Sequence, residues 1–136
     1  MKMTLKIAKK VAETCKQKAQ EIGIPMVIAV VDEGANTVLI ERMDGAMIAA
    51  VNIAQDKAYT AAATTFSTVE IGSIAQPGQA AYGIANADRG RIMIFAGGIP
   101  LKQKSAIVGA VGVSGGIATQ DQEVAQAGVE AFKAIA

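Results

Sequence analysis

Hydrophobic residues recur every three or four positions near the start of the chain, and this period predicts an amphipathic helix over 4–23. Thr4 is placed to cap the beginning of that helix and Gly23 to end it. The apolar run that follows, 26–31, is too short for a helix and is rich in β-branched residues. Such a run is typical of a central strand that is buried on both faces.

A second strand is predicted over 37–43, after the turn-forming residues 32–36. The two strands would form a hairpin, which is the start of an antiparallel sheet. Asp44 follows the second strand, and its carboxylate is placed to cap the next helix. Most residues on one face of that helix are alanine. The face is formed by Met47, Val51, Ala54, Ala58 and Ala61.

A capping box at Ser67 and Glu70 predicts a short helix over about 68–75. The stretch 79–90 has no convincing period and contains several turn-forming residues, so it is predicted to be an irregular loop. The apolar run 91–96 is predicted to be a third strand.

The longest predicted strand covers 105–114, and its two faces differ in side-chain size. Ala110, Gly112 and Ser114 make one face small, so another element must approach that face closely. The alanine-rich helix is the expected neighbour, and a ligand is the alternative.

A second capping box beginning at Thr119 predicts a final helix that reaches about residue 134. Gly128 inside this helix costs about 1 kcal/mol relative to alanine, which indicates a close packing contact. The chain shows no repeat or linker. The order of elements predicts one α+β domain over 1–136, with a mainly antiparallel sheet and helices packed on it.

The absence of histidine limits the chemistry of this chain, because imidazole is the commonest general base, zinc ligand and haem ligand. The segment Gly112–Gly116 fits the G-x-S-x-G pattern of serine hydrolases. The chain has no histidine to act as the base, and nothing marks a lysine as the alternative base, so serine catalysis is not expected. The acidic residues show no metal-ligand spacing. The only cysteine, Cys15, excludes an intrachain disulfide and is predicted to lie in the core.

The net charge of +1 gives no indication of a nucleic-acid partner. Six of the thirteen basic residues lie within the first 18 positions at helical spacing. This spacing is typical of the solvated face of a helix, and an anion- or lipid-binding face is the alternative. No window holds about 18 uninterrupted apolar residues and no signal-peptide pattern is present, so a cytoplasmic protein without a membrane span is predicted.

The glycine-rich turn before the last helix is a candidate anion site. Backbone N–H groups of Ser114, Gly115 and Gly116 could hold an anion, aided by the dipole of the following helix. Asp121 already supplies a negative charge in the first turn of that helix. A turn that merely requires glycine is therefore the alternative interpretation.

Arg42 and Lys57 are candidate partners for the carboxylates of a ligand, although each could equally belong to a surface ion pair. A tetrapyrrole would need an axial ligand other than histidine. The candidates are Tyr59, Tyr82, Met43 and Met47, and for the methionines a place in the core is the alternative.

Several of these segments, taken in order, resemble the GlcG/HbpS family, which includes the C-terminal domain of PduO-type proteins. They span nearly the whole chain, and they are Val31–Gly34, Arg42–Ala46, Asp56–Ala61, Gly97–Leu101, Val108–Gly116 and Gln120–Asp121. The resemblance implies a profilin-like fold with a five-stranded, mainly antiparallel sheet, and homo-oligomers from dimers up to octamers. It also implies binding of haem or a corrinoid, haem degradation, and a link to glycolate, glycerol or propanediol utilisation.

The chain departs from the family pattern in two respects. It has no histidine, so a histidine-ligated haem cannot form. Lys104–Ser105 also stands where a glycine-containing hairpin turn is common in the family.

We therefore expect a homo-oligomer that binds a small anionic ligand. The candidate ligand-binding residues are Arg42, Asp44, Lys57, Tyr59, Ser114, Gly115, Gly116 and Asp121. One alternative is a non-catalytic accessory or structural partner of a diol- or glycerol-metabolising enzyme system, and another is a tetrapyrrole-modifying enzyme. A binding site would bring Arg42 and Lys57 to one pocket, whereas a scaffold would bury or pair them.

Overall fold

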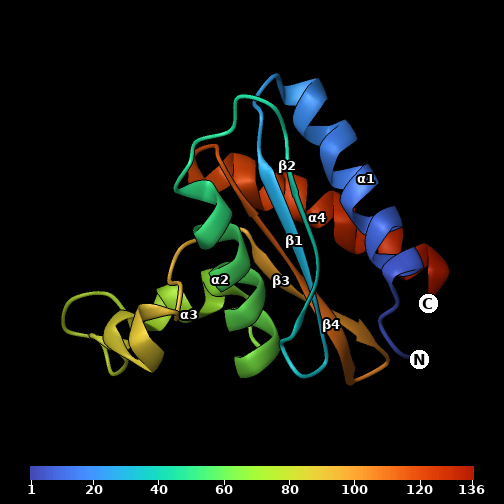
Figure 1. Cartoon of the computed structure of the whole chain (residues 1–136). Coiled ribbons are helices and arrows are strands. Elements are labelled where there is room, and N and C mark those ends of the chain that lie inside the picture. Colours follow the sequence, from blue (N-terminus) through green and yellow to red (C-terminus); the bar gives the residue numbers. More distant parts are fainter.

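The computed structural model describes all 136 residues. It contains four α-helices, four β-strands and two 3₁₀ turns (Figure 1). In chain order the elements are α1 (Leu5–Ile22), β1 (Val27–Asp32), β2 (Thr37–Arg42), α2 (Ala50–Thr64), α3 (Thr68–Ile74), η1 (Ile84–Asn86), η2 (Asp88–Gly90), β3 (Gly98–Gln103), β4 (Ala106–Ser114) and α4 (Ala118–Ile135). No helix combines the length and the apolar character that crossing a membrane would require.

The strands form one antiparallel sheet in the order β2-β1-β4-β3. The α+β class and the antiparallel pairing are confirmed, but the expectation of five strands was wrong, because only four strands pair. The predicted hairpin is present as β1 and β2. β1 is buried on both faces, since helices cover both sides of the sheet.

The predicted strand over 91–96 is absent, and β3 lies just beyond it. The reason lies in the backbone hydrogen bonds of this stretch, where the Met93 N–H donates to the Thr60 hydroxyl at 3.0 Å instead of to a strand. β3 contains Pro100, which lacks a backbone donor and is tolerated because β3 is an edge strand.

The two faces of the sheet are packed with side chains of different size. α1 and α4 cover one face, where bulky residues such as Ile28, Val111 and Phe132 form the larger core. α2 covers the other face, where the core consists largely of alanine. Figure 1 shows α2 on one side of the sheet and the α1–α4 pair on the other.

The small face of β4 is confirmed as the site of a close helix approach. A Cβ atom added to Gly112 would lie 2.1 Å from the carbonyl oxygen of Ala54 in α2. Gly128 has the corresponding role between α4 and α1, since its added Cβ would lie 2.6 Å from the sulfur of Cys15. Cys15 is fully buried, as predicted.

Helix ends were predicted with mixed success. Thr4 caps α1 and Gly23 ends it in the left-handed conformation, and the Ser67–Glu70 capping box is present. Asp44 does not cap α2, because a turn separates it from Ala49, the residue before the helix. Thr119 does not cap α4 either.

α4 begins one residue before Thr119, at Ala118, with Ile117 at the cap position. The Gln120 side chain accepts a hydrogen bond from the Ile117 N–H at 3.0 Å.

In the hairpin between β3 and β4, Lys104 adopts a positive φ of 56°, the conformation that glycine would favour at this turn.

Candidate functional site

Most of the candidate residues lie at one end of the sheet. In the strand register, Val27 at the start of β1 lies opposite Arg42 of β2 on one side and Ser114 of β4 on the other. Paired residues point to the same face of a sheet, so these three side chains belong to the face that α2 covers. The Cα atoms of Arg42 and Ser114 are two strand spacings apart, about 10 Å.

Lys57 of α2 forms the centre of this region through a buried ion pair. Its ammonium lies 2.9 Å from the carboxylate of Asp121 in α4 and donates to the carbonyl oxygen of Val113 at 2.8 Å. The Lys57 and Asp121 side chains are only 1% and 5% exposed. The pair therefore connects helices on opposite faces of the sheet around the end of β4.

Burial dominates the electrostatics of this pair. It lowers the pKa of Lys57 and raises the pKa of Asp121, because both charges are removed from water. The hydrogen bond and the attraction between the two groups oppose both shifts without cancelling them. The site thus holds an acid and a base side by side, screened from solvent.

The glycine-rich turn does not offer the free donors that an anion would need. The N–H of Gly116 donates to the second carboxylate oxygen of Asp121 at 2.8 Å. The Ile117 N–H donates to the side-chain oxygen of Gln120. An internal carboxylate thus occupies the place at the start of α4 where an external anion was one of the two possibilities considered.

Three further residues complete this region, and the sequence did not indicate that they belong to the site. Gly97 has a φ of 125°, and an added Cβ would lie 2.8 Å from the Lys57 nitrogen. Gln122 accepts the Gly97 N–H at 3.0 Å. The ring of Phe95, about half exposed, has its centroid 5.4 Å from the same nitrogen, within range of a cation–π interaction.

Tyr59 lies on α2 but belongs to a separate surface cluster. Its hydroxyl donates to Asp88, and the guanidinium of Arg91 stacks 3.6 Å from its ring centroid. Arg91 also pairs with Asp56 at 2.9 Å. The hydrogen bond to Asp88 raises the pKa of Tyr59. These contacts attach the irregular segment 75–97 to α2.

Arg42 and Lys57 do not converge on a pocket. Lys57 is buried and paired, whereas Arg42 is exposed and has no ion-pair partner or side-chain hydrogen bond. Asp44 is likewise exposed and unpaired. The turn after Arg42 also exposes Met47 and Ile48, whose exposed fractions are 55% and 84%.

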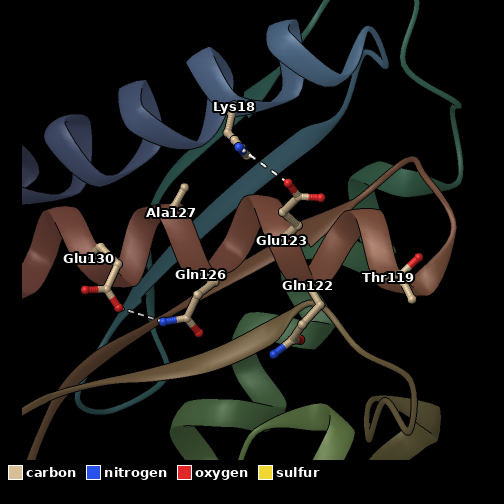
Figure 2. Close-up of a pocket in the computed structure, with 7 residues that line it drawn as sticks. All are labelled: Lys18, Thr119, Gln122, Glu123, Gln126, Ala127 and Glu130. Carbon is tan, nitrogen blue, oxygen red and sulfur yellow. Dashed lines mark hydrogen bonds and ion pairs between the residues drawn. The ribbon is translucent and has the colours of Figure 1, made fainter.

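The surface grooves lie elsewhere. The largest, about 530 Å³, is an open depression along α4 in which Lys18 of α1 approaches Glu123 and Gln126 donates to Glu130 (Figure 2). A second groove of about 390 Å³ shares Gln122 and Gln126 and reaches the edge of β3. A third, about 300 Å³, lies beside α3. None of the residues predicted from the sequence lines any of these grooves, and of the three residues added above only Gln122 does.

Comparison with known proteins connects this fold to proteins from several bacteria. An uncharacterised 15.0 kDa protein from the dhaT–dhaS intergenic region of Citrobacter freundii is 43% identical over 130 residues, which cover 96% of this chain and 92% of that protein. The corrinoid adenosyltransferase PduO of Salmonella typhimurium is 33% identical over 85% of the chain, but the match spans only 34% of PduO.

Solved structures agree with the sequence comparison. The crystal structure of Klebsiella pneumoniae protein ORFY shares 43% identity and a TM-score of 0.95, with coverage of 97% of this chain and 91% of that one. The crystal structure of a PduOC:heme complex shares 29% identity and a TM-score of 0.93, with coverage of 96% and 95%. The family model of haem-degrading HbpS-like proteins matches residues 3–130, so the chain belongs to the HbpS-like family, as its resemblance to GlcG/HbpS proteins predicted.

Proposed function

We propose that this chain binds haem, or a related anionic tetrapyrrole, without catalysing a reaction on it. The observation that carries the proposal is its likeness, over nearly its whole length, to a relative whose structure was solved with haem. The ligand would bind at the end of the sheet where β2 ends and α2 begins.

The residues at this end suit a flat apolar ligand with carboxylates. Arg42 is exposed and unpaired, and a guanidinium binds carboxylates in a bidentate manner. Met47 and Ile48 offer apolar surface in the adjacent turn. Tetrapyrrole sites combine an apolar lining with a few charged groups, and these residues supply both.

Without histidine, the protein ligands that remain from the usual set for haem iron are the sulfur of cysteine or methionine and the phenol of tyrosine. Burial raises the pKa of Cys15 to about 12 and keeps its thiol in the core, so it is not available as a ligand. The sulfur of Met43 accepts the Met26 N–H at 3.4 Å. Met47 and Tyr82 are exposed without such partners, and Met47 would hold the iron because it lies in the turn that follows Arg42. When bound, haem supplies a redox-active iron.

The assembly that we propose is a homo-oligomer, with the ligand covered by a second copy. Bound ligands of this size bury most of their surface, yet no groove of the single chain reaches Arg42 or Met47. A second subunit would supply the missing wall.

Lys57, Asp121 and the turn 114–116 would position the site rather than touch the ligand. Their polar groups already bond one another, so a ligand could contact them only by breaking these bonds. Tyr59 would act indirectly as well, through its contact with Asp88. Asp44 is exposed beside Arg42 and would favour a ligand that carries a hydrogen-bond donor.

We place the protein in the cytoplasm, in glycerol or propanediol utilisation. The support for the role in glycerol or propanediol utilisation is the relative from the dhaT–dhaS region and the match to PduO. A corrinoid is the second ligand to test. The adenosyltransferase activity of PduO is not part of the proposal, since the chain matches about a third of that protein.

The test is an absorbance titration with haemin, with cobalamin in parallel. We expect a saturable spectral shift with haemin. Arg42→Ala should weaken binding about tenfold, as loss of a charge-assisted hydrogen bond implies. Met47→Leu should change the spectrum while the protein still binds. Arg89→Ala is the matched control, because Arg89 is also exposed and unpaired but lies in η2.

An accessory role in the same enzyme system is the second candidate. The observation that favours it is the buried, paired state of Lys57, which is the arrangement expected of a scaffold. Absence of any shift with either ligand would contradict tetrapyrrole binding and leave the accessory role as the better explanation.

A further inference from the structure

The charge of this protein is unevenly distributed along the chain. Residues 1–18 carry six lysines and one glutamate, a net charge of +5, whereas the remainder carries seven basic and eleven acidic residues, a net charge of −4. α1 itself carries five of these lysines and two glutamates, a net charge of +3 in a protein whose total is +1.

Only some of these lysines are neutralised within the fold. Lys2, Lys16 and Lys18 each lie within 3.5 Å of a glutamate carboxylate. Lys6, Lys9 and Lys10 have no acidic partner and are exposed. They are three and four positions apart, so they share one face of the helix, which we call the lysine face.

We propose that the lysine face of α1, formed by Lys6, Lys9 and Lys10, is a docking surface for an acidic surface of another protein. Unpaired like charges on one helical face repel one another, and an acidic partner would remove that repulsion.

A second copy of the chain does not provide the complementary charge. Of the twelve acidic residues, all but Asp44 already have an intramolecular partner, either a cation or a hydrogen-bond donor. One exposed carboxylate cannot match three ammonium groups. The occupant is therefore a different protein with free carboxylates.

A membrane surface and a nucleic acid fit the lysine face less well. Most of the apolar side of α1 is buried against α4 and the sheet. Beside the lysines only Met1 and Leu5 expose large apolar side chains, at 47% and 49%, which is a small apolar surface for insertion into lipid. The exposed aromatic side chains that could stack on bases, Phe66, Tyr82 and Phe95, come from the segment 65–97 on the α2 and α3 side.

The lysine face also leaves the proposed ligand site free. α1 lies on the opposite side of the sheet from α2, as Figure 1 shows, whereas Arg42 lies on the α2 side. A partner on α1 and a ligand near Arg42 would bind independently, so the two proposals can fail separately.

The experiment measures the fluorescence anisotropy of a labelled oligoglutamate peptide that is titrated with the whole chain at low salt. Lys6→Glu, Lys9→Glu and Lys10→Glu are combined in one variant. The control variant combines Arg89→Glu, Lys102→Glu and Lys104→Glu, which reverses three exposed, unpaired charges elsewhere. Both variants have the same net charge.

We expect the α1 variant to bind at least about tenfold more weakly than the control variant, and added salt to weaken binding by the unaltered chain. The α1 variant should fold, because acidic residues near a helix N-terminus are favourable, and circular dichroism checks this. Equal losses in both variants, or no binding by the unaltered chain at low salt, would overturn the proposal. Tighter binding to phosphatidylserine-containing vesicles than to the peptide would overturn it in favour of a membrane surface.

Discussion

The ammonium of Lys57 and the carboxylate of Asp121 are 2.9 Å apart, although 64 positions separate the two residues in the sequence. α2 and α4, which supply them, pack on opposite faces of the sheet. The pair meets at the last residues of β4, where the Lys57 ammonium also donates to the Val113 carbonyl oxygen. It is therefore a polar connection between the two layers of helix.

Removal of one partner of this pair should destabilise the fold strongly. Lys57→Met leaves the Asp121 carboxylate buried without its cation, which typically costs about 3–5 kcal/mol. Adding Asp121→Asn removes the second charge while keeping an acceptor for the Gly116 N–H, so the double variant should be more stable than the single one. Urea unfolding measures both, and a loss below about 1 kcal/mol in Lys57→Met would contradict a structural role.

Cys15 should be unreactive in the native protein. Its pKa of about 12 leaves roughly one thiolate in ten thousand at pH 8, so a thiol reagent should label it only after unfolding. Rapid labelling of the native chain would contradict the burial of this residue.

The same shift in the pKa of Cys15 gives the sign of a pH effect. Between the ordinary value of 9.0 and about 12, the unfolded chain loses the thiol proton while the native chain keeps it. The free energy of unfolding of the unaltered protein, compared with that of Cys15→Ala, should therefore fall as the pH rises through this range. A difference that stayed constant with pH would show that the native thiol titrates normally.

Gly112→Ala should be among the most damaging single substitutions. The added methyl group would collide with backbone atoms of α2, which cannot move without displacing the helix. We therefore expect a loss above the usual overpacking cost of about 1–3 kcal/mol. Gly23→Ala is the control, because Gly23 has a positive φ but no neighbour within 4 Å. In Gly23→Ala, backbone strain alone should lower the free energy of unfolding by about 1–2 kcal/mol. Thermal unfolding compares the two, and equal losses would contradict the packing argument.

Thr60→Val should loosen the segment 75–97. The Thr60 hydroxyl accepts the Met93 N–H, and valine would leave that donor without a partner at a local cost of about 1–3 kcal/mol. Trypsin should then cut at Arg89 and Arg91 about tenfold faster.

Thr64→Val is the matched control for this cleavage experiment, because the Thr64 hydroxyl bonds only to nearby backbone atoms at 60 and 66. Equal cleavage rates in the two variants would show that the Thr60 hydroxyl does not restrain the segment.

Much of the fold could be predicted from the sequence, because its signals are local. The spacing of apolar residues correctly predicted α1. The small side chains of β4 correctly indicated that α2 lies against Gly112. The false strand at 91–96 has a composition typical of strands, but its backbone bonds to Thr60, 33 positions away from Met93. No local pattern contains that information.

The candidate site was predicted less well, for the same reason. Lys57 and Asp121 were both singled out, but their pairing depends on how α2 and α4 cross the end of the sheet. Gly97 was noticed only as part of a motif, although its lack of a side chain makes room for the Lys57 ammonium. Such contacts follow from tertiary packing, which residue spacing alone does not specify.

The unequal packing of the two sheet faces has a consequence for how this protein would tolerate random mutation. On the α2 face, where alanine and glycine lie against backbone, enlarging a side chain would be harmful and there is little left to truncate. On the α1–α4 face, truncation of Ile28, Val111 or Phe132 would open cavities, while exchange for another bulky aliphatic residue would often be accepted. A library of surviving variants should therefore show a strict upper limit on residue volume on one side of the sheet and a lower limit on the other.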